Sequence, residues 1–101
     1  MIMDQSVVVK MIVRVFLNES PGITKLSERY KLVFNCEGIP QIGLHFAVDM
    51  NESASVEIKE LHFNPFEKIL QYTAYSSWET LTEEEFYDVC KMFDCFWSKK
   101  K

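Results

Sequence analysis

Glycine, proline and histidine are scarce in this chain. Its 101 residues include three glycines, three prolines and two histidines. So few turn-forming residues leave little room for long loops, linkers or disordered segments. The sequence contains no GxGxxG, GxxxxGK[ST] or GxSxG motif. These absences argue against a phosphate-cradling glycine loop and against the nucleophile turn of serine hydrolases.

Paired cysteines and long apolar runs are also missing. Cys36, Cys90 and Cys95 are odd in number and show no CxxC spacing, which indicates free thiols in a reducing compartment. The most apolar stretch, residues 7–17, is interrupted by Lys10 and Arg14 and is too short to cross a bilayer. The first four residues show no basic start followed by an apolar run. We therefore expect no signal peptide, no membrane association and a cytoplasmic location.

Candidate catalytic and metal-binding groups are few. A nucleophilic cysteine needs a base and electropositive surroundings, whereas Cys90 and Cys95 lie among acids that raise the pKa of a thiol. His45 and His62 each occupy a Leu-His-Phe triplet, and we expect them on neighbouring strands of one outer sheet face, near Glu57 or Glu60. Their spacing matches no metal motif, so two solvated histidines are the simpler explanation. We predict that the protein is not an enzyme and holds no cofactor or metal ion. The alternative is a small-molecule or metal-binding domain, or an enzyme, that uses the outer sheet face around His45 and His62.

The sequence does contain a series of alternating segments. Residues 7–17 are rich in β-branched side chains and predict a central strand that ends in a turn at residues 20–22. Residues 23–27 fit either a short helical turn or the start of the next strand.

Residues 29–36 and 42–50 alternate with period two and predict a hairpin that sets Phe34 against Leu44. Arg29 is among the basic residues that we expect on the solvated faces of these strands. A further strand should follow and pair with residues 42–50, with a β-bulge near Lys59–Glu60, where the apolar parity changes. Residues 64–78 carry helix-start and strand signals, and we favour a strand from 68 to 76.

The chain ends in a predicted helix. Thr82 and Glu85 form a capping box, and the acids at residues 83–85 favour the positive end of a helix dipole. Six apolar residues then recur at helical spacing: Phe86, Val89, Cys90, Phe93, Phe96 and Trp97. Together these segments predict a single α+β domain over residues 1–101. It would be an antiparallel β-meander of four to five strands with a C-terminal amphipathic helix packed on one face.

Aromatic residues and negative charge are concentrated in the C-terminal third. Ten of the fourteen aromatic residues lie between Phe63 and Trp97, and residues 79–94 contain six acids against the single base Lys91. The net charge of −4 argues against direct binding of nucleic acid, which requires a cationic surface. Tyrosine, serine and tryptophan in residues 72–79 are instead typical of protein-binding surfaces.

We therefore predict a small acidic protein that binds another protein and inhibits it without catalysing a reaction. Tyr75 and Trp78 would be its apolar anchors, and Glu84, Tyr87 and Asp88 would form the outer face of the helix. The simpler explanation for Tyr75 and Trp78 is that they cover the helix–sheet junction. The acids would mask a basic, nucleic-acid-binding surface of the partner.

Proteins of a known type share this profile. In size, charge and composition, although in no motif, the chain is similar to toxin-immunity proteins and to phage inhibitors of defence nucleases, including anti-CRISPR proteins. A further alternative is a homodimeric structural subunit, joined through an edge strand or through the aromatic segment.

Overall fold

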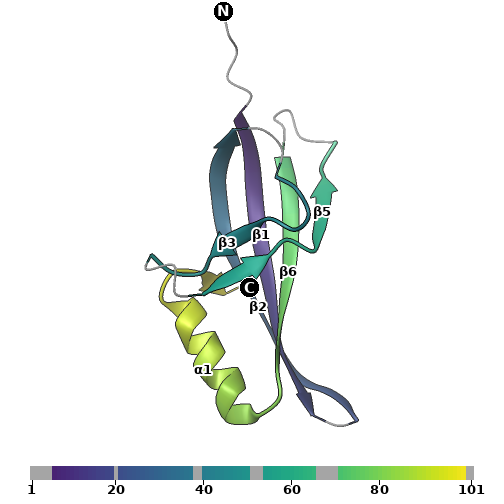
Figure 1. Ribbon diagram of the computed structural model, residues 1–101, viewed down its shortest axis with the longest axis vertical. Helices are drawn as coiled ribbons and strands as arrows, with labels where there is room; N and C mark the ends of the chain where they lie inside the picture. Colours follow the sequence, from purple (N-terminus) through teal and green to yellow (C-terminus); the bar gives the residue numbers. More distant parts are fainter. Residues whose placement is uncertain (1–5, 20, 38–39, 51–53, 66–70, 100–101) are drawn as a thin grey trace, which may run out of the picture.

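A five-stranded sheet carries most of the structure. The computed structural model describes residues 6–19, 21–37, 40–50, 54–65 and 71–99 (Figure 1). The sheet has the order β5-β6-β1-β2-β7. Its strands are β1 (Ser6–Glu19), β2 (Gly22–Glu37), β5 (Glu60–Phe63), β6 (Gln71–Thr80) and β7 (Ser98–Lys99). Two short strands, β3 (His45–Ala47) and β4 (Ser55–Glu57), pair in a second sheet, and helix α1 (Glu83–Asp94) follows β6. The predicted α+β class, central first strand and C-terminal helix are confirmed.

Strand β1 is paired along both of its edges. It forms an antiparallel hairpin with β2 on one side and a parallel pair with β6 on the other, from Val8 opposite Gln71 to Leu17 opposite Thr80. A parallel pair cannot be closed by a tight turn and needs a long crossover. The chain between β2 and β6, which includes the small sheet, supplies that crossover. The sheet is therefore mostly antiparallel, with one parallel pair that the sequence pattern did not predict.

The predicted hairpin between residues 29–36 and 42–50 is wrong. Phe34 pairs with Val9 of β1, and the later segment contributes only β3, which pairs with β4. A turn precedes β3, with Gly43 at φ 97, a value that favours glycine. Alternation correctly indicated an extended segment over residues 29–36, which lies in β2. Of residues 42–50 only 45–47 form a strand, and Ile42, Leu44 and Met50 are exposed, so the predicted buried face is wrong there. Alternation also carries no information about which strand lies alongside.

The parity change at Lys59–Glu60 marks a change of sheet and is not a β-bulge. Ile58 is fully buried, and its N–H donates to the Leu44 carbonyl at 2.9 Å beside the small sheet. The next residue, Lys59, donates its N–H to the Tyr75 carbonyl of β6 at 2.8 Å. Before this point β4 pairs with β3, as predicted, and after it β5 pairs with β6. Of the strand favoured over residues 68–76, residues 71–76 are observed in β6, which runs on to Thr80, and residues 68–70 lie outside the described residues.

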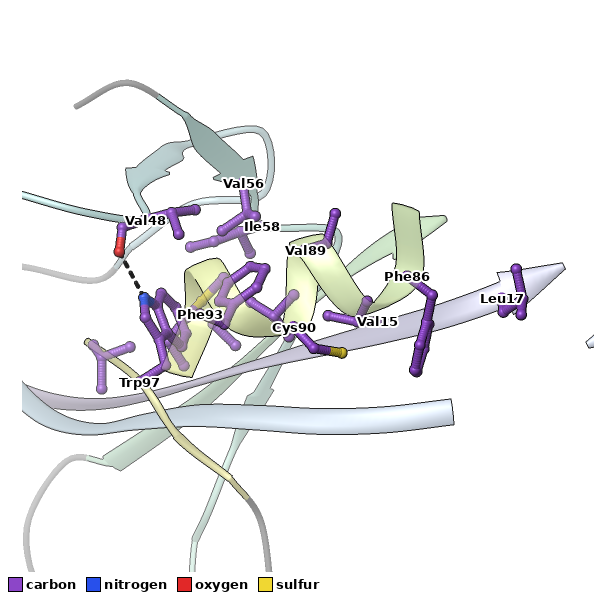
Figure 2. Packing of buried hydrophobic residues seen from close by; sticks show 14 of the residues in the cluster. Val15, Leu17, Val48, Val56, Ile58, Phe86, Val89, Cys90, Phe93 and Trp97 are labelled. Carbon is purple, nitrogen blue, oxygen red and sulfur yellow. Dashed lines mark hydrogen bonds between the residues drawn. The ribbon is translucent and has the colours of Figure 1, made fainter. Parts of the chain in front are cut away.

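The hydrophobic core lies between one face of the large sheet and a layer made by α1 and the small sheet. Alternate residues of β1 are at most 1% exposed: Val7, Val9, Met11, Val13, Val15 and Leu17. Figure 2 shows how Val48, Val56 and Ile58 pack over Cys90, Phe93 and Trp97 in this layer. Burial of this apolar surface is the main favourable term in folding.

Helix α1 begins and ends where its local chemistry dictates. The Thr82 hydroxyl accepts a hydrogen bond from the Glu85 N–H at 3.1 Å, which confirms the predicted cap. The buried stripe holds Phe86, Val89, Cys90 and Phe93. Phe96 was predicted to belong to this stripe, but it is 44% exposed because the helix ends at Asp94 and the helical spacing is lost.

Trp97 ties the C-terminal segment to the small sheet. Its side chain is 5% exposed, and its indole N–H donates to the Val48 carbonyl at 2.9 Å (Figure 2).

We expect Trp97→Phe to lower the free energy of unfolding by about 2 kcal/mol, because a buried carbonyl loses its donor. Urea unfolding followed by circular dichroism measures this. The control is Trp78→Phe, which removes an indole for which no hydrogen bond to a described residue is observed; an equal loss from both variants would contradict the role given to the bond.

Candidate protein-binding surface

One face of the large sheet lies opposite the layer formed by α1 and the small sheet. Cross-strand partners point to the same face of a sheet, so the register defines its rows. Rows of cross-strand partners from β2, β1 and β6 on this side include Tyr30, Ile12 and Tyr75; Glu28, Arg14 and Ser77; Leu26, Phe16 and Glu79. We call this surface, together with Ile23, the open face, because the described core residues of α1 and the small sheet pack on the other side.

The end of the open face near the β1–β2 turn is apolar and exposed. Leu26 is 58% exposed and lies opposite Phe16, and Ile23 is 63% exposed and lies opposite Asn18. A register shift between Leu17 and Asn18 brings Ile23 and Leu26, which are three residues apart, to the same face. Grouped exposed apolar side chains of this kind mark interaction surfaces more often than isolated ones do.

The middle of the open face is aromatic and is held in place by charged neighbours. The Arg14 guanidinium lies over the Tyr75 ring, 4.6 Å from its centroid, and Lys10 lies 5.1 Å from the centroid of Tyr30. The two tyrosines flank Ile12 from both adjacent strands, and Ile12 is only 3% exposed. Tyr75 is therefore positioned before any partner arrives, which lowers the entropic cost of binding.

Trp78 does not share a surface with Tyr75. The two residues are three apart on β6, so their side chains point to opposite faces. Trp78 packs edge-to-face on Phe93 of α1, with ring centroids 5.7 Å apart. Trp78 therefore covers the helix–sheet junction, as the simpler of the two explanations had it.

The predicted helix residues form a separate surface. Glu84 and Asp88 are exposed on α1. Tyr87 is 52% exposed and accepts a hydrogen bond from the Lys25 ammonium of β2, which also donates to Glu83 at 3.1 Å. The bond to Tyr87, followed by that to Glu83, raises the pKa of Lys25. The structure thus divides the five predicted partner-binding residues among the open face, the helix–sheet junction and the exposed side of α1.

Arg29 is buried, contrary to the expectation that the strand bases are solvated. Its side chain is 5% exposed, and its Nε donates to Asp94 at 2.9 Å, while Nη1 donates to the Ser27 hydroxyl. A second register shift, between Val9 and Met11, changes which parity of β2 faces the helix. Alternation read from the sequence alone cannot show such a shift.

The two histidines lie in different sheets, so the prediction that they occupy neighbouring strands is wrong. In β3, His45 has its Nε2 3.8 Å from the Glu57 carboxylate. In β5, His62 has its Nε2 3.2 Å from Glu60, and its ring meets Tyr75 edge-to-face at 5.2 Å. Among the residues that the structure describes, no group of three or more His, Cys, Asp or Glu side chains is arranged to hold a metal ion.

The described helix cysteines differ in their surroundings. Cys90 is buried and Cys95 is exposed. Burial is the main cause that raises the pKa of Cys90; Asp94 adds to the increase, and Arg29 and Ser27 oppose it. For Cys90 the expected direction is confirmed, but desolvation contributes more than the neighbouring acid does.

Comparison with known proteins identifies no function for this chain. No protein-family model matches this chain, and no curated protein or solved structure shows significant similarity to it. Over the part of the chain that the structure describes, no helix has the length and apolar character needed to cross a bilayer.

The pairing of Arg29 with Asp94 can be tested separately from any function. Removing the Asp94 charge leaves a buried guanidinium without its counter-ion, so we expect Asp94→Asn to lower the free energy of unfolding by about 2 kcal/mol. Asp88→Asn is the matched control in the same helix and should cost less than about 0.5 kcal/mol. Urea unfolding of both variants gives the comparison, and equal effects would show that the ion pair adds nothing.

Proposed function

We propose that this protein works by binding another protein, without catalysing a reaction, and that the open face is its main contact surface. The observation that carries the proposal is the exposure of Ile23 and Leu26, at 63% and 58%, on the same sheet face as Phe16 and Tyr75. Solvent exposure of these apolar side chains contributes nothing to the core, whereas burial against a partner would be favourable.

The chemistry around this apolar group supports the same function. Charged and polar side chains on the open face already have partners within the protein: Arg14 lies 3.8 Å from Glu28, and Asn18 donates to Glu79 at 3.1 Å. A partner can therefore cover the apolar centre while these groups remain at the rim. An apolar centre with a polar rim is the usual anatomy of a protein interface.

The open-face proposal predicts the effect of Ile23→Ser combined with Leu26→Ser. We expect the tagged protein to capture a stoichiometric partner from the lysate of its source cell, and the double variant to bind that partner at least about tenfold more weakly. Tyr75→Ala should weaken binding in the same direction.

The matched control is Ile42→Ser combined with Met50→Ser. These residues are 65% and 84% exposed and flank β3 of the small sheet, away from the open face, so the control loses at least as much exposed apolar surface. Binding that survives the open-face variants would overturn the proposal. Light scattering adds a further reading: a dimer that only the open-face variants dissociate would identify a second copy of this chain as the partner.

A specific observation favours a second contact surface on α1, suited to a basic partner. Glu83 and Asp94 are paired with bases of β2, whereas Glu84, Glu85 and Asp88 are exposed and form no ion pair with a described residue. The helix dipole accounts for acids in the first turn but not for Asp88. An inhibitor that masks a nucleic-acid-binding surface would use these charges to steer association.

The acidic-helix alternative makes a different prediction. If α1 is the contact surface, Glu84→Gln combined with Asp88→Asn should weaken capture of the partner several-fold at low salt and much less at high salt, because exposed charges are screened. Glu19→Gln combined with Glu60→Gln removes the same charge elsewhere on the exposed surface and should leave capture unchanged. Equal effects from the two pairs would mean that net charge matters and the helix surface does not.

A further inference from the structure

Part of the outer edge of β6 has no strand hydrogen-bonded to it among the described residues, although β4 lies nearby. Strand β1 pairs with β6 along its whole length, whereas β5 on the other side covers only Tyr72 to Tyr75 (Figure 1). The Tyr75 carbonyl, which accepts from Lys59, points toward the β5 side. Peptide groups alternate across a strand, so those of Ser77 and Glu79 point the same way. No described residue forms a backbone hydrogen bond with them there.

The edge is free because the chain that could have covered it enters the core. Strand β5 runs antiparallel to β6, so the residues just before Glu60 are the ones that would lie opposite Ser77 and Glu79. Ile58 is instead buried and bonded to Leu44 beside the small sheet. Burial of one isoleucine therefore exposes a short length of strand edge.

A cleft of about 360 Å³ adjoins this edge. It lies between β4 and β6, and its lining includes His45, Glu57, Lys59, Ser76, Trp78 and Glu79. Ser76 is 4% exposed, and its hydroxyl is buried without a hydrogen-bond partner among the described residues. Lys59 donates to the Ser77 hydroxyl at 3.3 Å, a side-chain contact that leaves the edge backbone unpaired.

We propose that the outer edge of β6 at Ser77–Glu79 binds an extended segment of another protein as an added strand, and that this segment carries lysine or arginine. An added strand would satisfy the outward N–H and C=O groups of both residues, as in other cases of strand addition. Its side chains would alternate between the two faces. One face offers the cleft with Glu57 and Trp78, and the other offers Tyr75 and Glu79.

The charge of the edge selects the occupant. The carboxylate of Glu57 is 3.8 Å from His45 and that of Glu79 accepts from an asparagine, so neither is paired with a lysine or arginine among the described residues. The opposing explanation is that Lys59 and Glu79 protect the edge from any strand, since charged side chains often have this role. The two explanations differ in whether a basic strand is accepted.

Amide hydrogen exchange measured by NMR tests the proposal with a synthetic probe. The probe is a blocked hexapeptide of alternating lysine and valine, and the comparison is the same peptide with glutamate in place of lysine. We expect the lysine peptide, at saturating concentration, to slow exchange at Ser77 and Glu79 at least about tenfold. The amides of Ser76 and Trp78 point toward β1 and serve as internal controls that should not change.

Each other outcome overturns the proposal. No added protection from the lysine peptide would mean that the edge is closed to strands, and equal protection from both peptides would remove the role of charge. Protection that rises with protein concentration in the absence of peptide would identify a second copy of this chain as the occupant.

A matched pair of variants provides a second test. Ser77→Pro removes the outward N–H without breaking the ladder to β1, because proline is tolerated where a strand N–H faces away from its neighbour. Ser77→Ala keeps that N–H and loses the hydroxyl. We expect the alanine variant to keep the lysine-dependent protection of Glu79 and the proline variant to lose it; loss from both or from neither contradicts strand addition. Should the proline variant fail to fold, the exchange data on the unchanged chain decide alone.

This proposal deepens the proposed protein-binding function. The peptide probe does not involve Ile23 or Leu26, so the strand-addition proposal and the open-face proposal can each fail while the other stands.

Discussion

The structure depends on the burial of one face of β1 while both edges of that strand are hydrogen-bonded. Val9, Met11, Val13, Val15 and their alternate neighbours form the floor of the core, and α1 and the small sheet gain their stability by covering it. Because β2 and β6 occupy the two edges of β1, every later element is placed at the periphery or above one face. The other face remains available, and no described part of the helical layer extends to it.

Local chemistry made much of this fold predictable. The cap at Thr82, the apolar spacing from Phe86 to Phe93 and the β-branched alternation of β1 are properties of neighbouring residues, and all three are confirmed. Strand partners are set by contacts distant in sequence, so the alternation in residues 29–36 fitted a hairpin with 42–50 as well as the true pairing with β1. The change in apolar alternation at Lys59 is visible in the sequence. A β-bulge and a passage of the chain from one sheet to the other produce the same change, so the sequence alone does not distinguish them.

The candidate surface was less predictable than the fold, for a related reason. Tyr75 was identified from composition and lies on the open face, whereas Trp78 was grouped with it although the two lie on opposite sides of β6. Ile23 and Leu26 fell in a segment whose structure was ambiguous, and only a register shift brings them to one face. Register shifts decide which side chains meet solvent, and no local pattern in β2 reveals where they occur.

The parallel pairing of β1 with β6 has a consequence for synthesis of the chain. The two strands are adjacent in space but separated by the whole of β2, both strands of the small sheet and β5. On the ribosome, β1 and β2 can form their hairpin early, yet one edge of β1 and its apolar face must wait until residues 71–80 and α1 emerge. Contacts of such long range form slowly. Until they form, the hairpin of β1 and β2 has an unpaired strand edge that other nascent chains can bind, which favours aggregation. The sheet around β1 is therefore completed only after the last third of the chain has been translated.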